Sequence, residues 1–304
     1  MNINMLRDID DDAGWYAAAC AADPAATWTG ANLYVTRDLR ATYSFLATLV
    51  NEATMGTLTN ALGDFHSGNM VDELNSINVV LSNGSLSSTT YDGLLSGVNT
   101  CIVGDEILYF RDAILEGDGS YTLTGLLRGR RGSEYAMTNH VASERFILVN
   151  TPTITRVPQV TADIGSSYIY KAVMAGGNLS SAPEKAFTNL GTGLKPYSVA
   201  QLGGGRNAAG DVIINWVRRT RISGEWRDNV DVLLGETSEA YEVEIWDSTY
   251  TTLKRTITGL SAQSATYTAA QQTTDFGALQ ATVYVTVYQL SGVVGRGHPA
   301  NGSI

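Results

Sequence analysis

The segment Thr282–Leu290 reads TVYVTVYQL, and this stretch decides the fold class of the chain. Its valines alternate with tyrosine and threonine, so every second side chain points to the same face of an extended backbone. The segments Asp211–Arg219 (DVIINWVRR) and Tyr241–Trp246 (YEVEIW) alternate in the same way. A period of two is typical of half-buried strands, and it places Trp216 on an apolar face, where we expect it to be a core residue.

The last third of the chain contains further short runs of strand composition. They are Tyr197–Gln201, Leu253–Ile257, Ala265–Thr268 and Ala300–Ile304. About seven strands in about 110 residues, with a tryptophan on the second, match a single β-sandwich. We therefore predict a β-sandwich over residues 193–304, with Gly203-Gly204-Gly205 as a flexible turn between its first two strands.

Runs of strand length and composition also occur throughout the preceding sequence. They are Ala31–Thr36, Thr42–Leu49, Ile77–Leu81, Glu106–Phe110, Ser120–Leu123, Arg145–Val149 and Ser167–Met174. Asn83-Gly84 and Asp118-Gly119 predict hairpin turns, because both residue types tolerate the positive φ of a type I′ turn.

These patterns divide the chain into four parts. Residues 1–14 are an acidic N-terminal arm, and residues 15–150 a β-rich domain. Residues 151–192 are a short β segment that continues or links the first domain, and residues 193–304 are the sandwich. The predicted fold class is mostly β, built from several sandwich-like or barrel-like modules.

The charge balance narrows the class of partner. The 304 residues include 20 Lys and Arg against 30 Asp and Glu, a formal charge of −10. Such an acidic chain is not expected to bind nucleic acid or an anionic membrane surface, since both are held by clustered basic residues. No apolar run approaches the about 18 residues that span a bilayer, and no secretory leader is recognisable. We therefore expect assembly in the cytoplasm.

Few motifs of reactive chemistry are present. His66, His140 and His298 are far from one another and from Cys20 and Cys101 in sequence, so neither a zinc site nor any other metal site is expected. We expect the cysteines to be free thiols, with a bridge between them as the alternative. No cofactor motif and no nucleophile motif occurs, which favours a non-enzymatic protein.

Carboxylates leave one enzymatic alternative open. Glu134, Glu144, Glu242 and Glu244 could pair as the acid and base of a glycosidase, but only if the fold brings two of them together. Glu242 and Glu244 share one strand face, where like charges suit solvent or a subunit contact better.

The motif Gly125–Glu134, GLLRGRRGSE, concentrates basic residues in an acidic chain. Its glycines allow tight turns, and Arg128, Arg130 and Arg131 follow in close succession. Because a guanidinium pairs with carboxylates through two hydrogen bonds, we predict an inter-subunit or intra-domain clamp. The alternatives are a solvated loop paired locally to Glu134 and a nucleic-acid contact.

A second candidate interface lies in the connection Arg218–Leu234. It contains Arg218, Arg219, Arg221 and Trp226, and loops on a rigid sandwich are where binding surfaces usually occur. Trp226 and Trp246 are candidate surface-binding residues, for which core packing, a protein interface and saccharide stacking remain open.

Four motifs in order carry a resemblance to a known family. They are Asp10–Tyr16 (DDDAGWY), Gly125–Glu134, Gly235–Tyr241 (GETSEAY) and Tyr267–Gln272 (YTAAQQ). From about Asp8 to Ile304 the chain resembles the C-terminal part of the large tail-tip proteins of siphophages and gene transfer agents, also called baseplate hub or host-specificity proteins. Its last part resembles a fibronectin type III module. Some larger relatives carry an upstream glycosidase-like barrel, whose activity is not transferred to this chain.

The resemblance implies a structural role in the virion. It predicts a component of the tail tip or baseplate hub of a long non-contractile-tailed bacteriophage, supporting host attachment or DNA delivery. Expected partners are other tail-tip or baseplate proteins and further copies of the chain, with a homotrimer favoured. The alternatives are a receptor- or saccharide-binding module that meets a host receptor or glycan, and a cell-wall glycan hydrolase.

Overall fold

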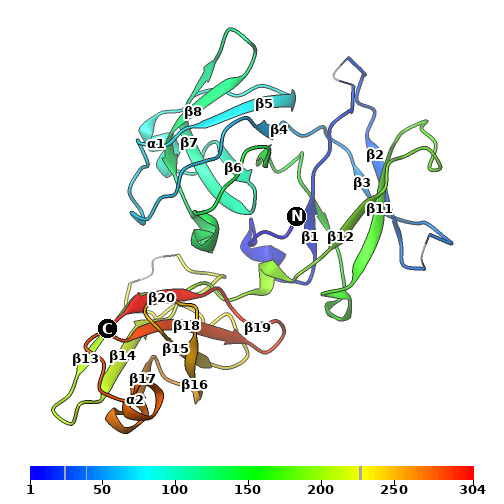
Figure 1. Ribbon diagram of the computed structural model, residues 1–304. Helices are drawn as coiled ribbons and strands as arrows, with labels where there is room; N and C mark the ends of the chain where they lie inside the picture. The colour runs from blue at the N-terminus through cyan, green and yellow to red at the C-terminus, as the bar shows by residue number, and fades with distance from the viewer. Residues whose placement is uncertain (24, 39, 226–227) are drawn as a thin grey trace. The chain divides into compact units, whose positions relative to one another are not determined.

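A computed structural model describes the chain from residue 1 to 304 except residues 24, 39, 226 and 227 (Figure 1). The structure is mostly β, as the alternating sequence pattern predicts. The chain divides into two compact units. One comprises Met1–Leu6 and Asp12–Gly193, and the other Arg7–Asp11 and Leu194–Ile304. Among the helices of the described residues, none has the length and apolar character needed to cross a membrane.

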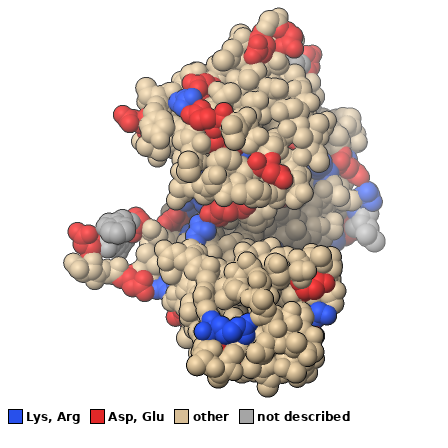
Figure 2. Space-filling view, turned by 60° about the vertical axis from the view of Figure 1, so that its left-hand side comes forward, with Lys and Arg blue, Asp and Glu red and all other residues tan. Residues whose placement is uncertain are grey.

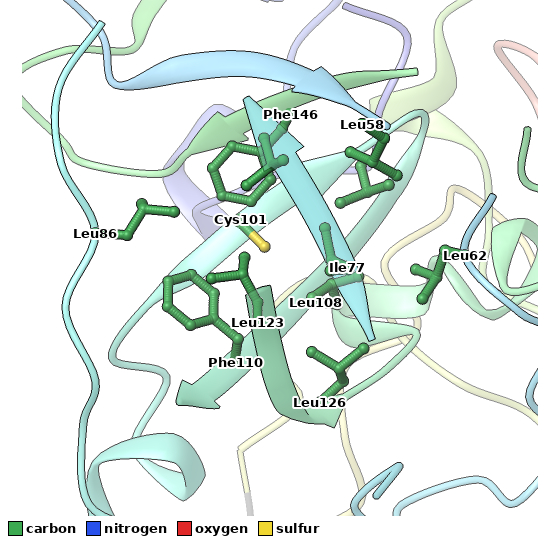
Figure 3. Packing of buried hydrophobic residues seen from close by; sticks show 12 residues of the cluster. Leu58, Leu62, Ile77, Leu86, Cys101, Leu108, Phe110, Leu123, Leu126 and Phe146 are labelled. Atoms are coloured by element: carbon green, nitrogen blue, oxygen red, sulfur yellow. The ribbon is translucent and has the colours of Figure 1, made fainter. Parts of the chain in front are cut away.

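A closed antiparallel barrel forms the centre of the first unit. Its strands, in spatial order, are β4 (Met55–Leu58), β5 (Ile77–Asn83), β8 (Tyr121–Leu127), β7 (Glu106–Leu115), β6 (Thr100–Val103) and β9 (Arg145–Leu148). Side chains from these strands meet inside the barrel, where Phe110, Phe146 and Cys101 pack among leucines, valines and Ile77 (Figure 3). A short helix, α1 (Tyr91–Leu95), lies beside β7. Closure leaves this sheet without edges.

A smaller sheet completes the first unit. Its spatial order is β12 (Lys185–Thr188), β11 (Ser167–Met174), β2 (Ala31–Thr36) and β3 (Ser44–Leu49), and a separate pair joins β1 (Trp15–Ala17) to β10 (Thr155–Val157). Trp15 packs against Tyr170 and Phe187, with ring centroids 5.1 and 4.7 Å away. Trp15 and Tyr170 belong to the buried core of this sheet together with aliphatic residues such as Leu33 and Val35, and Phe187 packs against that core.

The second unit is a two-sheet sandwich. One sheet contains β13 (Ala200–Arg206), β14 (Val212–Val217) and β17 (Ser264–Tyr267); the other contains β16 (Leu253–Leu260), β15 (Tyr241–Trp246), β18 (Tyr284–Ser291), β19 (Gly295–Arg296) and β20 (Ala300–Ser303). Alternate residues of both sheets share one core, in which Trp216 is buried 5.1 Å from the ring of Tyr241. The core position expected for Trp216 is confirmed.

Helical structure is sparse. The helix α2 (Ala269–Phe276) begins at Thr268, whose hydroxyl accepts from Gln271 N while the Gln271 side chain accepts from Thr268 N. Gly277 ends it in a left-handed conformation. Short 3₁₀ turns occur at Asp8–Asp10, Arg130–Gly132, Glu134–Ala136, Thr161–Asp163 and Thr192–Leu194.

Two turn predictions are wrong and one is right. Asp118-Gly119 closes the hairpin between β7 and β8, as predicted. Asn83-Gly84 does not close a hairpin, because β5 pairs with β4 and β8 instead. Gly203-Gly204-Gly205 lies within β13, where Gly204 must lack a side chain because an added Cβ would lie 2.0 Å from the Ile213 carbonyl oxygen.

Both cysteines are free, and Cys101 is buried in the barrel.

We expect Gly56→Ala to destabilise the barrel. A Cβ at Gly56 would lie 2.2 Å from the Val80 carbonyl oxygen, and a strand backbone cannot yield as a side chain can. The free energy of unfolding should fall by about 1–3 kcal/mol in chemical denaturation. Gly205→Ala is the matched control, since its Cβ would meet nothing within 4 Å. Equal stability of the two variants would contradict the packing argument.

Candidate functional site: a buried arginine cluster in the barrel

The glycine-arginine motif begins where β8 ends. Gly125, Gly129 and Gly132 all have positive φ, and the chain turns sharply after Leu127 into two 3₁₀ turns. A Cβ on Gly129 would lie 2.4 Å from Met137 Sδ, so glycine is required for this close approach as well as for its φ. Arg128 lies just before these turns, and its side chain is buried at this end of the barrel.

The side chain of Arg128 is fully buried and uses all three of its nitrogens. Nε donates to both carboxylate oxygens of Glu106 at 2.8 and 3.0 Å. Nη1 donates to Asp72 Oδ2 at 3.2 Å and to the Gly63 carbonyl at 3.1 Å, and Nη2 donates to the Met137 carbonyl at 3.1 Å. Arg128 therefore connects strand β7 with the loops 63–75 and 129–140.

Glu106 is the second centre of the cluster. It is completely buried and also accepts from Gly129 N at 2.7 Å and from His140 Nε2 at 2.9 Å. Asp72, equally buried, accepts from the backbone of Leu74 and Asn75 and so fixes the turn that follows it. Each buried carboxylate thus has several donors, which compensate its loss of water.

His140 extends the cluster to the rim of the barrel. Its Nδ1 lies 2.6 Å from Glu144 Oε2, and Glu144 is partly exposed. Burial lowers the pKa of His140, but hydrogen bonds and charge from Glu106 and Glu144 outweigh it and raise the pKa above the ordinary 6.5. When His140 carries its second proton, it and Arg128 together balance the charge of the two fully buried carboxylates.

The side chains of the other charged residues of the motif lie outside this cluster. Arg130 is half-buried and donates to the Arg128 carbonyl at 3.0 Å and to Asn69 Oδ1 at 2.8 Å. Arg131 is exposed, and its carbonyl accepts from Asn4 at 2.8 Å. Glu134 is half-buried beside Gly129. Of the two clamps considered, Arg128 therefore forms the intra-domain one, because its side chain is fully buried and pairs with carboxylates of its own unit.

The arginines of the second candidate interface pair within their own unit. Arg218 bonds to Asp231 at 2.5 Å and to the Val232 carbonyl at 2.8 Å. Arg219 lies over the Tyr197 ring, 5.3 Å from its centroid. Arg221 pairs with Asp11 and with Glu236.

Of the two tryptophans predicted to bind a partner at the surface, the structure describes only Trp246. Trp226 lies outside the described residues. Trp246 is half-buried at the end of β15, on the face of its sheet turned away from the core. Glu242 and Glu244 lie on that same face, where both pair with Arg296.

Sequence reasoning missed Asp72, Glu106 and the role of His140. One signal was available for Glu106: a hairpin centred on Asp118-Gly119 brings the start of β7 opposite the residues that follow β8, so Glu106 reaches the arginine motif. Asp72 and His140 had no such signal, because they belong to loops that only barrel closure brings together.

The side chains of the cluster are shielded from solvent, so we interpret the cluster as a structural feature and not as a binding site. The side chains of Arg128, Asp72 and Glu106 have no exposed area, and that of His140 is 3% exposed, so a substrate outside the barrel does not reach them. Among the residues that the structure describes, no group of three or more His, Cys, Asp or Glu is arranged to hold a metal ion. What the arrangement does is fix two loops at one end of the barrel.

Comparison with known protein families gives a match to the part of the chain that forms the barrel. Residues 53–147 match the family described as Rcc01698-like, C-terminal. This family is found in gene-transfer-agent and phage-like proteins. The match covers less than a third of the chain, but it runs from just before β4 into β9 and so contains the barrel and its arginine cluster. No curated protein matches the chain.

We expect Arg128→Ala to destabilise the chain strongly. Removing one partner of a buried ion pair leaves the carboxylates of Glu106 and Asp72 uncompensated, which costs about 3–5 kcal/mol. Chemical denaturation measures the loss. Arg37→Ala is the control, because this pair with Asp163 is long and the Arg37 side chain is 48% exposed, so it should cost less than about 1 kcal/mol. Similar losses in both variants would refute the central role of Arg128.

The raised pKa of His140 predicts a pH dependence of stability. A folded-state pKa above 6.5 means that the folded chain holds the proton more tightly than the unfolded chain. The stabilisation is complete below pH 6.5 and is lost as the pH rises through the folded-state pKa. Denaturation between pH 5.5 and 9 should show this loss in the wild type and not in His140→Gln. His66→Gln, at an exposed position, should retain the wild-type dependence.

Proposed function

We propose that this chain is a non-enzymatic structural component of the tail tip or baseplate hub of a long-tailed, non-contractile bacteriophage. The observation that carries the proposal is the match of the barrel to the Rcc01698-like, C-terminal family. The resemblance to tail-tip proteins also supports it, since three of its four motifs lie outside the matched residues. The chain would be located at the virion tail tip after assembly in the host cytoplasm.

The surface chemistry suits assembly. Charged residues make up only 16% of the chain, and Figure 2 shows acidic and basic side chains in small separate groups on a largely uncharged surface. Contacts on such a surface require little desolvation of charge. An oligomer, with a trimer about the tail axis favoured, follows from the same proposal.

The loops fixed by the arginine cluster offer the contact surface. Met70 and Leu74, on either side of Asp72, are exposed, and so is Val141, next to His140. The two loops are joined by a hydrogen bond of 2.9 Å from Asn139 N to Asp64 Oδ1. Exposed apolar side chains on a rigid support are typical of a protein interface. We propose that another tail protein or a further copy of the chain packs here.

We expect Leu74→Glu to block assembly without unfolding the chain. Leu74 is 91% exposed, so a charge there costs little in the free chain but is desolvated in an interface. Co-purification of tail proteins with the tagged chain, and immunogold labelling of virions, measure incorporation. Val160→Glu, at another exposed apolar position of the first unit, is the matched control. Label absent from the tail tip of wild-type virions would refute the placement.

A further inference from the structure

The sheet that contains β15 and β18 has an outer face unlike the rest of the sandwich. Valines and Ile245 of these strands point into the core, so the alternate residues point outward. The outward residues form three cross-strand pairs: Trp246 with Tyr284, Glu244 with Thr286, and Glu242 with Tyr288. Aromatic rings thus lie at both ends of the face. Between them lie Glu242, which is partly exposed, and Glu244 and Thr286, which are buried.

The rings form a platform. Tyr250 packs edge-on to Tyr284 at 5.8 Å and is fixed by a hydrogen bond of 2.7 Å from its hydroxyl to the Gly302 carbonyl. Tyr288 lies four residues from Tyr284 on the same strand, about 13 Å away. All of these rings, like that of Trp246, are half-buried. Trp246, Tyr250 and Tyr284 therefore lie together at one end of the face, and Tyr288 lies at the other end beneath Arg296.

Trp246 lies beside Tyr284 as its cross-strand partner. Its indole nitrogen is shielded from solvent and finds no acceptor among the described residues. A shielded donor without an acceptor is unusual in a folded protein. No hydrogen bond has to be broken for the ring to adjust to a ligand.

Hydrogen-bonding groups lie between the rings. Arg296 donates to both oxygens of Glu242 at 2.8 Å, and it pairs with Glu244 at 2.7 Å. Thr286 Oγ1 donates to Asn301 Oδ1 at 2.8 Å. Asn301 is exposed, and its amide nitrogen has no acceptor within the described part of the chain, which leaves two donor hydrogens for a ligand.

The net charge of the face determines whether it favours a neutral or an anionic ligand. Two carboxylates surround one guanidinium, which is engaged by both of them and also lies over the Tyr288 ring, 4.6 Å from its centroid. Glu242, Glu244 and Arg296 together therefore carry an excess negative charge, and the guanidinium is engaged by both carboxylates. An anionic ligand is disfavoured, while hydroxyl groups find both acceptors and donors.

We propose that this face binds an uncharged glycan built of hexose or N-acetylhexosamine units. The apolar faces of the sugar rings stack on Trp246 and Tyr284, and their hydroxyls bond to Glu242 and Asn301. This inference is carried by the second unit alone and does not depend on the proposed place of the chain in a virion.

The test uses the full chain with defined oligosaccharides. Maltohexaose and chitohexaose are the neutral probes, and hexagalacturonate is the anionic one. Saturation-transfer NMR and calorimetric titration should detect at least one neutral probe and show at least tenfold weaker binding of the anionic probe. Trp246→Ala should weaken the neutral binding at least tenfold. Tyr91→Ala, which removes an exposed ring from the barrel unit, should not change it.

Folding of each variant is checked by its thermal melt. Because truncation of Trp246 could disturb the sheet, Asn301→Ala, at an exposed position, is a second variant and should weaken binding about fivefold or more. No binding of either neutral probe, or binding unchanged in both variants, would overturn the proposal. Incorporation of Trp246→Ala into virions is expected to be normal, so failure of this proposal is distinguishable from failure of the assembly role.

Discussion

One buried guanidinium ties together segments of the barrel unit that are far apart in sequence. Arg128 pairs with Glu106 and Asp72 and donates to the carbonyls of Gly63 and Met137, and its side chain has no exposed area. An unpaired charge in this place would cost several kcal/mol, so the loops adopt the one arrangement that completes its hydrogen bonds. The barrel strands supply the rigid wall, and the arginine cluster determines the shape of its end.

Strand periodicity made much of the fold predictable. The segments Ala31–Thr36 and Ser167–Met174 match β2 and β11 residue for residue, because alternation and turn residues bounded both clearly. The helix α2 was missed, although its capping pair Thr268 and Gln271 and its terminal Gly277 were visible in the sequence. An eight-residue helix has too few turns for its period to stand out.

The site was predictable only in part. The glycines and arginines of 125–134 indicated a tight, charged structure, but not that Arg128 alone turns inward while Arg131 stays exposed. That choice depends on the positive φ of Gly129 and on carboxylates that come from β7 and from a distant loop. Closing a six-stranded barrel is a long-range event, and no local pattern encodes which loops meet at its end.

Hydrogen exchange tests the central claim most directly, because it reports the order of each loop separately. If the arginine cluster organises the end of the barrel, Arg128→Met should lose amide protection in both loops, 63–75 and 129–140. The barrel strands, β7 among them, should lose clearly less protection than the two loops in the same sample. Unchanged protection of both loops would contradict the account, and so would a uniform loss over the whole unit.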